Sequence, residues 1–243
     1  MLFSALAFGQ KVDMNLFKDM KARSIGPAAM SGRITAIDVV ESNPEIIYAG
    51  AASGGLWRST GGGLNWEPLF DDEAVLGIGA ISIYQKNPDI IWVGTGEGNP
   101  RNSVSGGYGV YRSIDGGETW DLMGLEKTRN IHRIYIHPDN PNIVYVGAIG
   151  SPWGEHEERG LFRTKDGGKT WEKILYTNNL TGVADMVADP SNPNKIFVAM
   201  WEHKRWPWFF KSGGPGSGLY VTNDGGDTFK NLTLEADQIT FMP

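Results

Sequence analysis

The residues best suited to chemistry lie in three long polar segments, which start at Thr95, Ala148 and Met200. Together these segments place tryptophans beside carboxylates, arginines and histidines. Aromatic rings next to charged groups suit stacking against a sugar or anchoring of a peptide. We therefore predict ligand-binding roles for Glu97, Arg101, Trp153, His156, Glu157, Trp201, His203, Arg205, Trp206 and Trp208. The competing interpretation is that the tryptophans only pack, as large aromatic side chains usually do.

Carboxylates in and near these segments raise the possibility of glycoside hydrolysis. That reaction needs two carboxyl groups on either side of the bond that is cleaved. The sequence offers acidic candidates but no spacing that selects a pair: Asp71, Asp72, Glu73, Glu97, Glu157 and Glu202. For this reason no catalytic residue is assigned from the sequence.

Several other chemistries are disfavoured. His156 with Glu157, and Glu202 with His203, could in principle bind a metal, but no recognised ligand spacing is present, so we predict neither a metal nor a cofactor. The chain has no cysteine, no G-x-S-x-G elbow, no P-loop and no H-E-x-x-H motif. A net charge of −6 without a basic cluster argues against nucleic acid as a partner.

The segments are set in a fourfold internal repeat, over 32–70, 76–125, 129–176 and 181–234. Each repeat begins with an alternating apolar run, such as RITAIDV or IHRIYIH, followed by an Asn-Pro turn and a near-continuous apolar run. These patterns predict a half-buried strand and then a fully buried one. The predicted turns lie at Asn43-Pro44, Asn87-Pro88, Asn140-Pro141 and Asn192-Pro193.

A specific motif, S/T-x-D-x-G-x-T-W, separates the third and fourth strands of each repeat. Its Asp can accept backbone N–H groups, its glycines supply positive φ, and its Trp packs between layers. We assign structural roles to Ser113, Asp115, Gly117, Thr119, Trp120, Thr164, Asp166, Gly168, Thr170, Trp171, Thr222, Asp224, Gly226, Thr228 and Phe229. The first copy has Gly61 for Asp and Asn65 for Thr, and is expected to form fewer side-chain bonds. One repeat therefore predicts one four-stranded antiparallel blade of an all-β propeller.

The motif resembles the Asp box of the bacterial-neuraminidase-repeat propellers, which include sialidases, xyloglucan hydrolases, photosystem assembly factors and sortilin-type receptors. The phrases SGRITAIDV, AGAASGGLWRS and SGGPGSGLYVTNDGG are most similar to bacterial sortilin-N-terminal-like repeat proteins, which are often labelled glycosyl hydrolases. The resemblance implies a larger propeller of about six to ten blades, of which four are present here, and a closed four-bladed ring is the alternative. It also implies that the long segments share one face, opposite the Asp boxes.

The resemblance allows one weak link to sialidases, which use three arginines. GRITAI at Arg33 is faintly similar to their Arg-Ile-Pro element, with Thr35 in place of Pro, and Arg129 and Arg133 could complete the trio. We favour the simpler explanation that Arg33 is a solvated or strand-edge arginine.

The N-terminus suggests export. Residues 2–8 form an apolar run followed by small residues and Gln10, which is typical of the end of a signal peptide. The domain prediction is a signal-peptide remnant over 1–10, a lead-in over 11–31 and a propeller segment over 32–243. We expect a periplasmic, cell-surface or extracellular location and no transmembrane segment, because no later run approaches ~18 apolar residues.

Three functions remain open at this point, and we favour the first of them, which is not an enzyme. The first is an exported, non-catalytic, sortilin-like propeller whose loop face binds a protein, peptide or glycan. The second is a glycoside hydrolase, sialidase-like or other, with carboxylates on the loop face. The third is a structural segment of a larger cell-surface protein, whose partners are further blades or a second copy.

Overall fold

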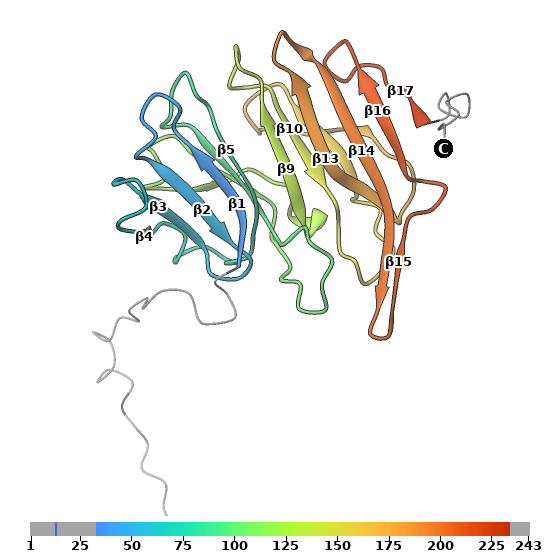
Figure 1. The fold of residues 1–243 in the computed structure, drawn as a ribbon, viewed down its shortest axis with the longest axis horizontal. Helices are drawn as coiled ribbons and strands as arrows, with labels where there is room; N and C mark the ends of the chain where they lie inside the picture. Colours follow the sequence, from blue (N-terminus) through green and yellow to red (C-terminus); the bar gives the residue numbers. More distant parts are fainter. Residues whose placement is uncertain (1–12, 14–32, 234–243) are drawn as a thin grey trace, which may run out of the picture.

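The computed structural model describes Asp13 and residues 33–233, and each repeat forms one antiparallel sheet in this range (Figure 1). The first sheet contains, in order, β1 (Ile34–Val39), β2 (Ile47–Ala51), β3 (Leu56–Ser59) and β4 (Glu67–Pro68). The second contains β5 (Ile78–Ile83), β6 (Ile91–Thr95), β7 (Val110–Ser113) and β8 (Asp121–Leu122).

The later repeats follow the same order. The third sheet contains β9 (Ile131–Ile136), β10 (Val144–Ala148), β11 (Gly160–Thr164) and β12 (Glu172–Leu175). The fourth contains β13 (Thr181–Asp189), β14 (Asn192–Trp206), β16 (Gly218–Thr222) and β17 (Lys230–Asn231), and β15 (Phe209–Ser212) pairs with the far part of β14. A short 3-10 turn, η2 (Glu126–Thr128), follows β8. The predicted all-β propeller fold, with four four-stranded blades, is confirmed.

Successive sheets pack face to face through their first strands, with β1 against β5, β5 against β9 and β9 against β13. Figure 1 shows the sheets following one another in chain order, from blue to orange. Each of three apolar clusters fills the space between two consecutive sheets. The core is therefore divided between blades rather than gathered at one centre.

Glycines in the second strands set how closely the blades approach. A Cβ on Gly50 would lie 2.4 Å from Cγ2 of Ile78, and one on Gly94 would lie 2.3 Å from Cγ2 of Ile131. Both isoleucines are fully buried. Burying such a side chain contributes about 1.5–3 kcal/mol, so these glycine–isoleucine contacts are a substantial part of blade packing.

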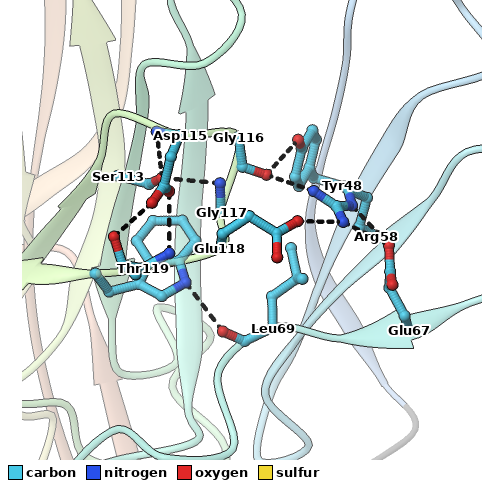
Figure 2. A network of polar contacts seen from close by, with 11 residues as sticks. Tyr48, Arg58, Glu67, Leu69, Ser113, Asp115, Gly116, Gly117, Glu118 and Thr119 are labelled. Carbon is cyan, nitrogen blue, oxygen red and sulfur yellow. Dashed lines mark hydrogen bonds and ion pairs between the residues drawn. The ribbon is translucent and has the colours of Figure 1, made fainter.

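The turn between the third and fourth strands, which we call the corner, is closed by side-chain hydrogen bonds. In the second blade Ser113 Oγ donates to Asp115 Oδ1 at 2.7 Å and accepts from the Gly117 N–H at 2.8 Å. Asp115 accepts from the backbone N–H and the hydroxyl of Thr119 (Figure 2). These bonds from Thr119 and Ser113 lower the pKa of Asp115 to about 2. The third and fourth corners repeat the same bonds.

Each complete corner is also bonded to the preceding blade, an arrangement that we call the seam. The Gly116 carbonyl accepts from the Tyr48 hydroxyl and from Arg58 Nη1, both at 2.9 Å (Figure 2). The indole N–H of the corner tryptophan Trp120 donates to the carbonyl of Leu69, in the first blade. In the later seams Arg112 donates to the Gly167 carbonyl, Tyr145 and Arg163 donate to the Gly225 carbonyl, and Trp171 donates to the Met123 carbonyl.

The first corner is simpler, as expected from its sequence. Ser59 Oγ still accepts from the N–H groups of Gly61 and Gly63, at 3.3 and 2.8 Å. Because Gly61 and Asn65 replace Asp and Thr, the carboxylate bonds of the other corners have no counterpart here. The turn is therefore held by the Ser59 hydroxyl, by backbone bonds such as that from the Leu64 N–H to the Gly61 carbonyl, and by the Trp66 indole N–H, which donates to the Gly63 carbonyl.

The corners and the turns between first and second strands lie at the same end of each blade. The N–H of Gly116 donates to the Asp89 carbonyl, and the N–H of Gly167 to the Asn142 carbonyl. We call this end the corner face. The remaining connections, from second to third strands and from one blade to the next, lie at the other end, which we call the loop face.

Two predicted details are wrong in the fourth repeat. The segment from Met200 to Ser217 is not one loop, because β14 continues to Trp206 and pairs with β15. The chain also reverses just before Asn192, where Asp189 pairs with Asn192, and not at Asn192-Pro193. Within the described range, no helix has the length and apolar character that crossing a membrane requires. The predicted signal-peptide remnant over 1–10 lies outside the described residues.

Candidate functional site

A polar groove of about 810 Å³ lies on the loop face, where the connections of the second, third and fourth blades meet. Its walls come from the β6–β7 and β10–β11 loops and from the links that lead into the third and fourth blades. It is lined by Tyr108, Glu126, Lys127, Arg129, Glu155, His156, Glu157, Glu158 and Asn179. Hydroxyl, amide and charged groups of both signs thus face the same space.

A buried arginine holds the wall of the groove in place. Arg159 is fully buried, and its guanidinium donates to the carbonyls of Ser151, Gly154 and Leu180. Burial lowers the pKa of Arg159 to about 10, so it remains charged at neutral pH. Because its bonds join the 149–159 loop to the link before β13, the two loops keep a fixed separation.

The opposite wall is held by Asn130 and by unusual backbone geometry. Asn130 Nδ2 donates to the carbonyls of Glu97 and Ser105, and the Gly107 N–H donates to the Arg129 carbonyl at 2.6 Å. Arg129 has φ 67° and ψ −57°, a conformation that residues other than glycine rarely adopt. Such backbone strain is concentrated at functional sites. The strained backbone of Arg129, in the lining of the groove, therefore supports a functional role for the groove.

Four glutamates line the groove: Glu126, Glu155, Glu157 and Glu158. Glu155 Oε1 lies 3.9 Å from Lys204 Nζ, and Glu158 Oε2 lies 3.8 Å from Lys173 Nζ. Glu126 comes from η2, on a different connection from the other three. Carboxylates from two connections therefore border one polar space, which is what acid–base catalysis on a bound ligand requires.

His156 adds a neutral polar group to the groove. Its backbone N–H donates to the Asn179 carbonyl at 2.8 Å, and its buried Nδ1 has no hydrogen-bond partner among the described residues. Burial, together with the charge of Arg159, lowers the pKa of His156. The imidazole is thus uncharged at neutral pH and can exchange a hydrogen bond with a ligand.

The structure brings only part of the predicted binding set to this groove. His156 and Glu157 line it, and Trp153 lies half-exposed in the same loop. Glu97 does not reach it, because its side chain is buried and bidentate with Arg33, at 2.6 and 3.1 Å. Arg101 is exposed on the β6–β7 loop.

The other predicted residues lie on the hairpin of β14 and β15. His203 is buried, with its ring stacked on Trp201 at 4.6 Å, and burial lowers the pKa of His203 to about 4. Trp201 Nε1 donates to Ser212 Oγ. Arg205, Trp206 and Trp208 lie toward the far end of the hairpin.

The predicted carboxylates and arginines do not gather into one cluster. Of the six acidic candidates only Glu157 lines the groove, and Glu202 is buried in an ion pair with Lys211 at 2.7 Å. Arg33 binds Glu97, and Arg133 binds Asp185 at 2.6 Å. Arg129 alone of the three arginines lines the groove. No group of three or more His, Asp or Glu side chains in the described part of the chain could hold a metal ion.

Sequence reasoning missed most of the groove lining: Tyr108, Glu126, Lys127, Glu155, Glu158 and Asn179. Glu126, Lys127 and Asn179 lie in short links between blades, which carry no unusual composition. Glu155 and Glu158 flank predicted residues in the EHEE run and could have been included on that ground.

The sequence comparisons match both a receptor family and enzymes. The family model described as sortilin, neurotensin receptor 3 matches residues 108–243, which is more than half of the chain. Xyloglucanase Xgh74A of Acetivibrio thermocellus is 26% identical over 224 residues, covering 78% of this chain and 24% of that protein. A xyloglucanase of Paenibacillus sp is 26% identical over 183 residues, covering 70% of this chain and 17% of that protein. The chain spans about a quarter or less of the length of these curated relatives.

Solved structures show the same fold. The chain resembles an ancestral GH74 enzyme with a TM-score of 0.64 and 20% identity, covering 86% of this chain and 26% of that one. It resembles the GH74 enzyme of Niastella koreensis with a TM-score of 0.60 and 21% identity, covering 81% of this chain and 29% of that one. At this identity the likeness establishes the propeller fold alone.

These relatives correct the function that the sequence analysis placed first. The sequence alone favours a non-catalytic, sortilin-like binding propeller over an enzyme. The curated relatives contradict this expectation, because they are xyloglucanases that match 78% and 70% of this chain. Tryptophans and receptor-like phrases are visible in the sequence, whereas the convergence of glutamates from separate connections depends on the way the blades meet.

Proposed function

This chain belongs to the family of the sortilin, neurotensin receptor 3 model, and from that premise we propose that its blades form part of a glycoside hydrolase acting on a β-glucan of the xyloglucan type. The observation that carries the proposal is the polar groove on the loop face, with four glutamates along its lining. The xyloglucanase relatives support the same reaction class and supply the substrate class.

The groove contains the groups that hydrolysis of a glycosidic bond needs. One carboxyl group donates its proton to the leaving oxygen, and a second carboxylate acts as base or nucleophile at the anomeric carbon. Glu126 and Glu157 are our candidates, because they line the same groove from different connections. Arg129, Lys127 and Asn179 supply donors for sugar hydroxyls, and the neutral His156 can exchange one hydrogen bond with the sugar.

Two further features belong to this proposal. The repeats are interpreted as Asp-box repeats, on the basis of the corner bonds of Asp115, Asp166 and Asp224. We also propose export, because a polysaccharide substrate lies outside the cell and residues 2–8 form an apolar run typical of a signal peptide.

The test measures new reducing ends when the purified full chain acts on xyloglucan, mixed-linkage glucan and a fluorogenic glycoside panel. We expect hydrolysis of the β-glucans, and a fall of about 10²- to 10⁴-fold in Glu126→Gln and in Glu157→Gln, because acid–base groups contribute on that order. The matched control is Glu45→Gln, an exposed glutamate on the corner face, which should hydrolyse like the wild type.

A wild-type chain that leaves every substrate intact would refute the proposal. Full activity in both Glu126→Gln and Glu157→Gln would refute the assigned residues. Thermal unfolding of each variant shows whether a loss of activity comes from a loss of fold.

A further inference from the structure

The hairpin of β14 and β15 extends beyond the other strands of its sheet (Figure 1). The turn that joins its two strands is rich in aromatic residues. We call residues 201–212 the aromatic arm. At its tip Trp208 is 82% exposed and Phe209 is 58% exposed. With Trp206 they line a hollow of about 430 Å³. Exposed apolar patches of this kind mark interaction sites, because they gain free energy when a ligand covers them.

The arm is fixed in position before any ligand binds. Four residue pairs, from His203 with Ser212 to Trp206 with Phe209, join its two strands. Arg205 Nε donates to the Pro100 carbonyl and Arg205 Nη1 to Asn102 Oδ1, both at 2.8 Å, and its guanidinium lies 4.5 Å from the Phe210 ring centroid. A site held this way loses little conformational entropy on binding.

The arm continues from the groove. The Arg205 N–H donates to the Pro152 carbonyl, in the loop that carries Glu155 and Glu157. Lys204 Nζ lies 3.9 Å from Glu155 Oε1 and 5.1 Å from the Trp206 ring centroid. Lys204 therefore stands between the charged groove and the aromatic tip, and one extended ligand can reach both.

We propose that the tip of the aromatic arm is a stacking platform for pyranose rings of a polysaccharide whose neighbouring part lies in the groove. This inference rests on the proposed function. A β-linked glucan has apolar C–H faces and hydroxyl-bearing edges. Its faces fit the rings of Trp206, Trp208 and Phe209, and its edges fit the donors and carboxylates of the groove.

The ligand class follows from the two parts taken together. A purely apolar partner would leave the groove glutamates and Lys127 without hydrogen-bonding groups. A glucan chain offers hydroxyl groups to the groove and apolar ring faces to the tip.

The experiment measures binding of the full chain to xyloglucan polymer by affinity electrophoresis, with a short xyloglucan oligosaccharide measured in parallel by calorimetry. Trp208→Ala should weaken polymer binding roughly tenfold, the scale of one lost anchoring aromatic. Trp208→Phe should retain most of the affinity, because a ring remains. Leu64→Ala, at a side chain 94% exposed in the first corner, is the control and should bind as the wild type does.

Unchanged polymer binding in both Trp208→Ala and a Trp208→Ala/Phe209→Ala double variant would overturn the platform. So would loss of self-association or of vesicle binding in Trp208→Ala while polymer binding stays intact, since the tip would then serve a second copy or a lipid surface. A wild type that binds the polymer through Trp208 but never hydrolyses it would retain the platform and refute the proposed function. The two failures are therefore distinguishable.

Discussion

The two ends of the blades differ in how closely the repeats agree. On the corner face, three corners repeat the same bonds, and the carbonyls of Gly116, Gly167 and Gly225 each accept from the blade before. On the loop face, the second-to-third connection is short in the first blade, long in the second and third, and a paired hairpin in the fourth. The groove and the aromatic arm both belong to the loop face.

This difference shows where the repeat constrains the chain. Residues that make a seam must match a neighbouring blade, so their identity recurs with the repeat. Loops need only begin and end at the right strands, so their composition is free to vary and they carry the chemistry. Substitutions on the two sides should therefore change different properties.

The largest expected effect is on stability, at a contact between blades. Leu161 is fully buried between the third and fourth blades, and Leu161→Ala should lower the free energy of unfolding by about 3 kcal/mol, from lost burial and the cavity left behind. Leu219 is the equivalent residue of the fourth repeat and is 42% exposed. Leu219→Ala should change stability by less than about 0.5 kcal/mol. Urea unfolding measures both, and equal losses would contradict this account of the blade interface.

A smaller effect is expected on completing the first corner. The φ of Gly61 lies outside the left-handed region, so an aspartate can adopt the backbone conformation there. A Cβ at this position would lie 2.9 Å from Asn65 Oδ1, so the substitution also requires a smaller side chain, threonine, at position 65. The double variant Gly61→Asp/Asn65→Thr should gain about 1 kcal/mol of stability from the restored carboxylate bonds. The single variant Gly61→Asp serves as the control and should gain less. A destabilised double variant would show that the first corner differs in more than these two side chains.

The smallest effect is a pH dependence confined to the complete corners. Bonds from the Thr170 hydroxyl and N–H lower the pKa of Asp166 from 3.8 to about 2. The ionised carboxylate therefore stabilises the folded chain fully above about pH 4, and this contribution is lost as the pH falls through 2. Asp166→Asn should show a shallower loss of stability between pH 4 and pH 2 than the wild type. An unchanged slope in Asp166→Asn would contradict this account of the corner.

Sequence reasoning predicts the scaffold well because the scaffold is local and periodic. The alternating runs predict β1, β5, β9 and β13, and the four motif copies place the corners and identify the weak one. Only the fourth repeat departs, since the polar and aromatic run after Met200 reads as a loop but pairs with itself as β14 and β15.

The candidate site is predicted less well because it is assembled from separate repeats. The distance between Glu126 and Glu157 along the chain says nothing about their meeting in one groove, which depends on how far the blades rotate against each other. Glu97 and Glu202 illustrate the converse. Both lie in the polar segments where we predict ligand binding. Their carboxylates instead form ion pairs with Arg33 and Lys211, which stabilise the loops.

The seams have a consequence for exchanging or duplicating parts of this chain. Each seam is split between neighbours, with the Arg58 donor in one blade and the Gly116 acceptor in the next. The fourth repeat has Val221 where Arg58, Arg112 and Arg163 stand in the other three. A fourth-type blade moved to an inner position would leave the following carbonyl without its arginine. A segment chosen for grafting should therefore contain both halves of a seam. It should begin within one sheet and end within the next, instead of comprising one whole sheet.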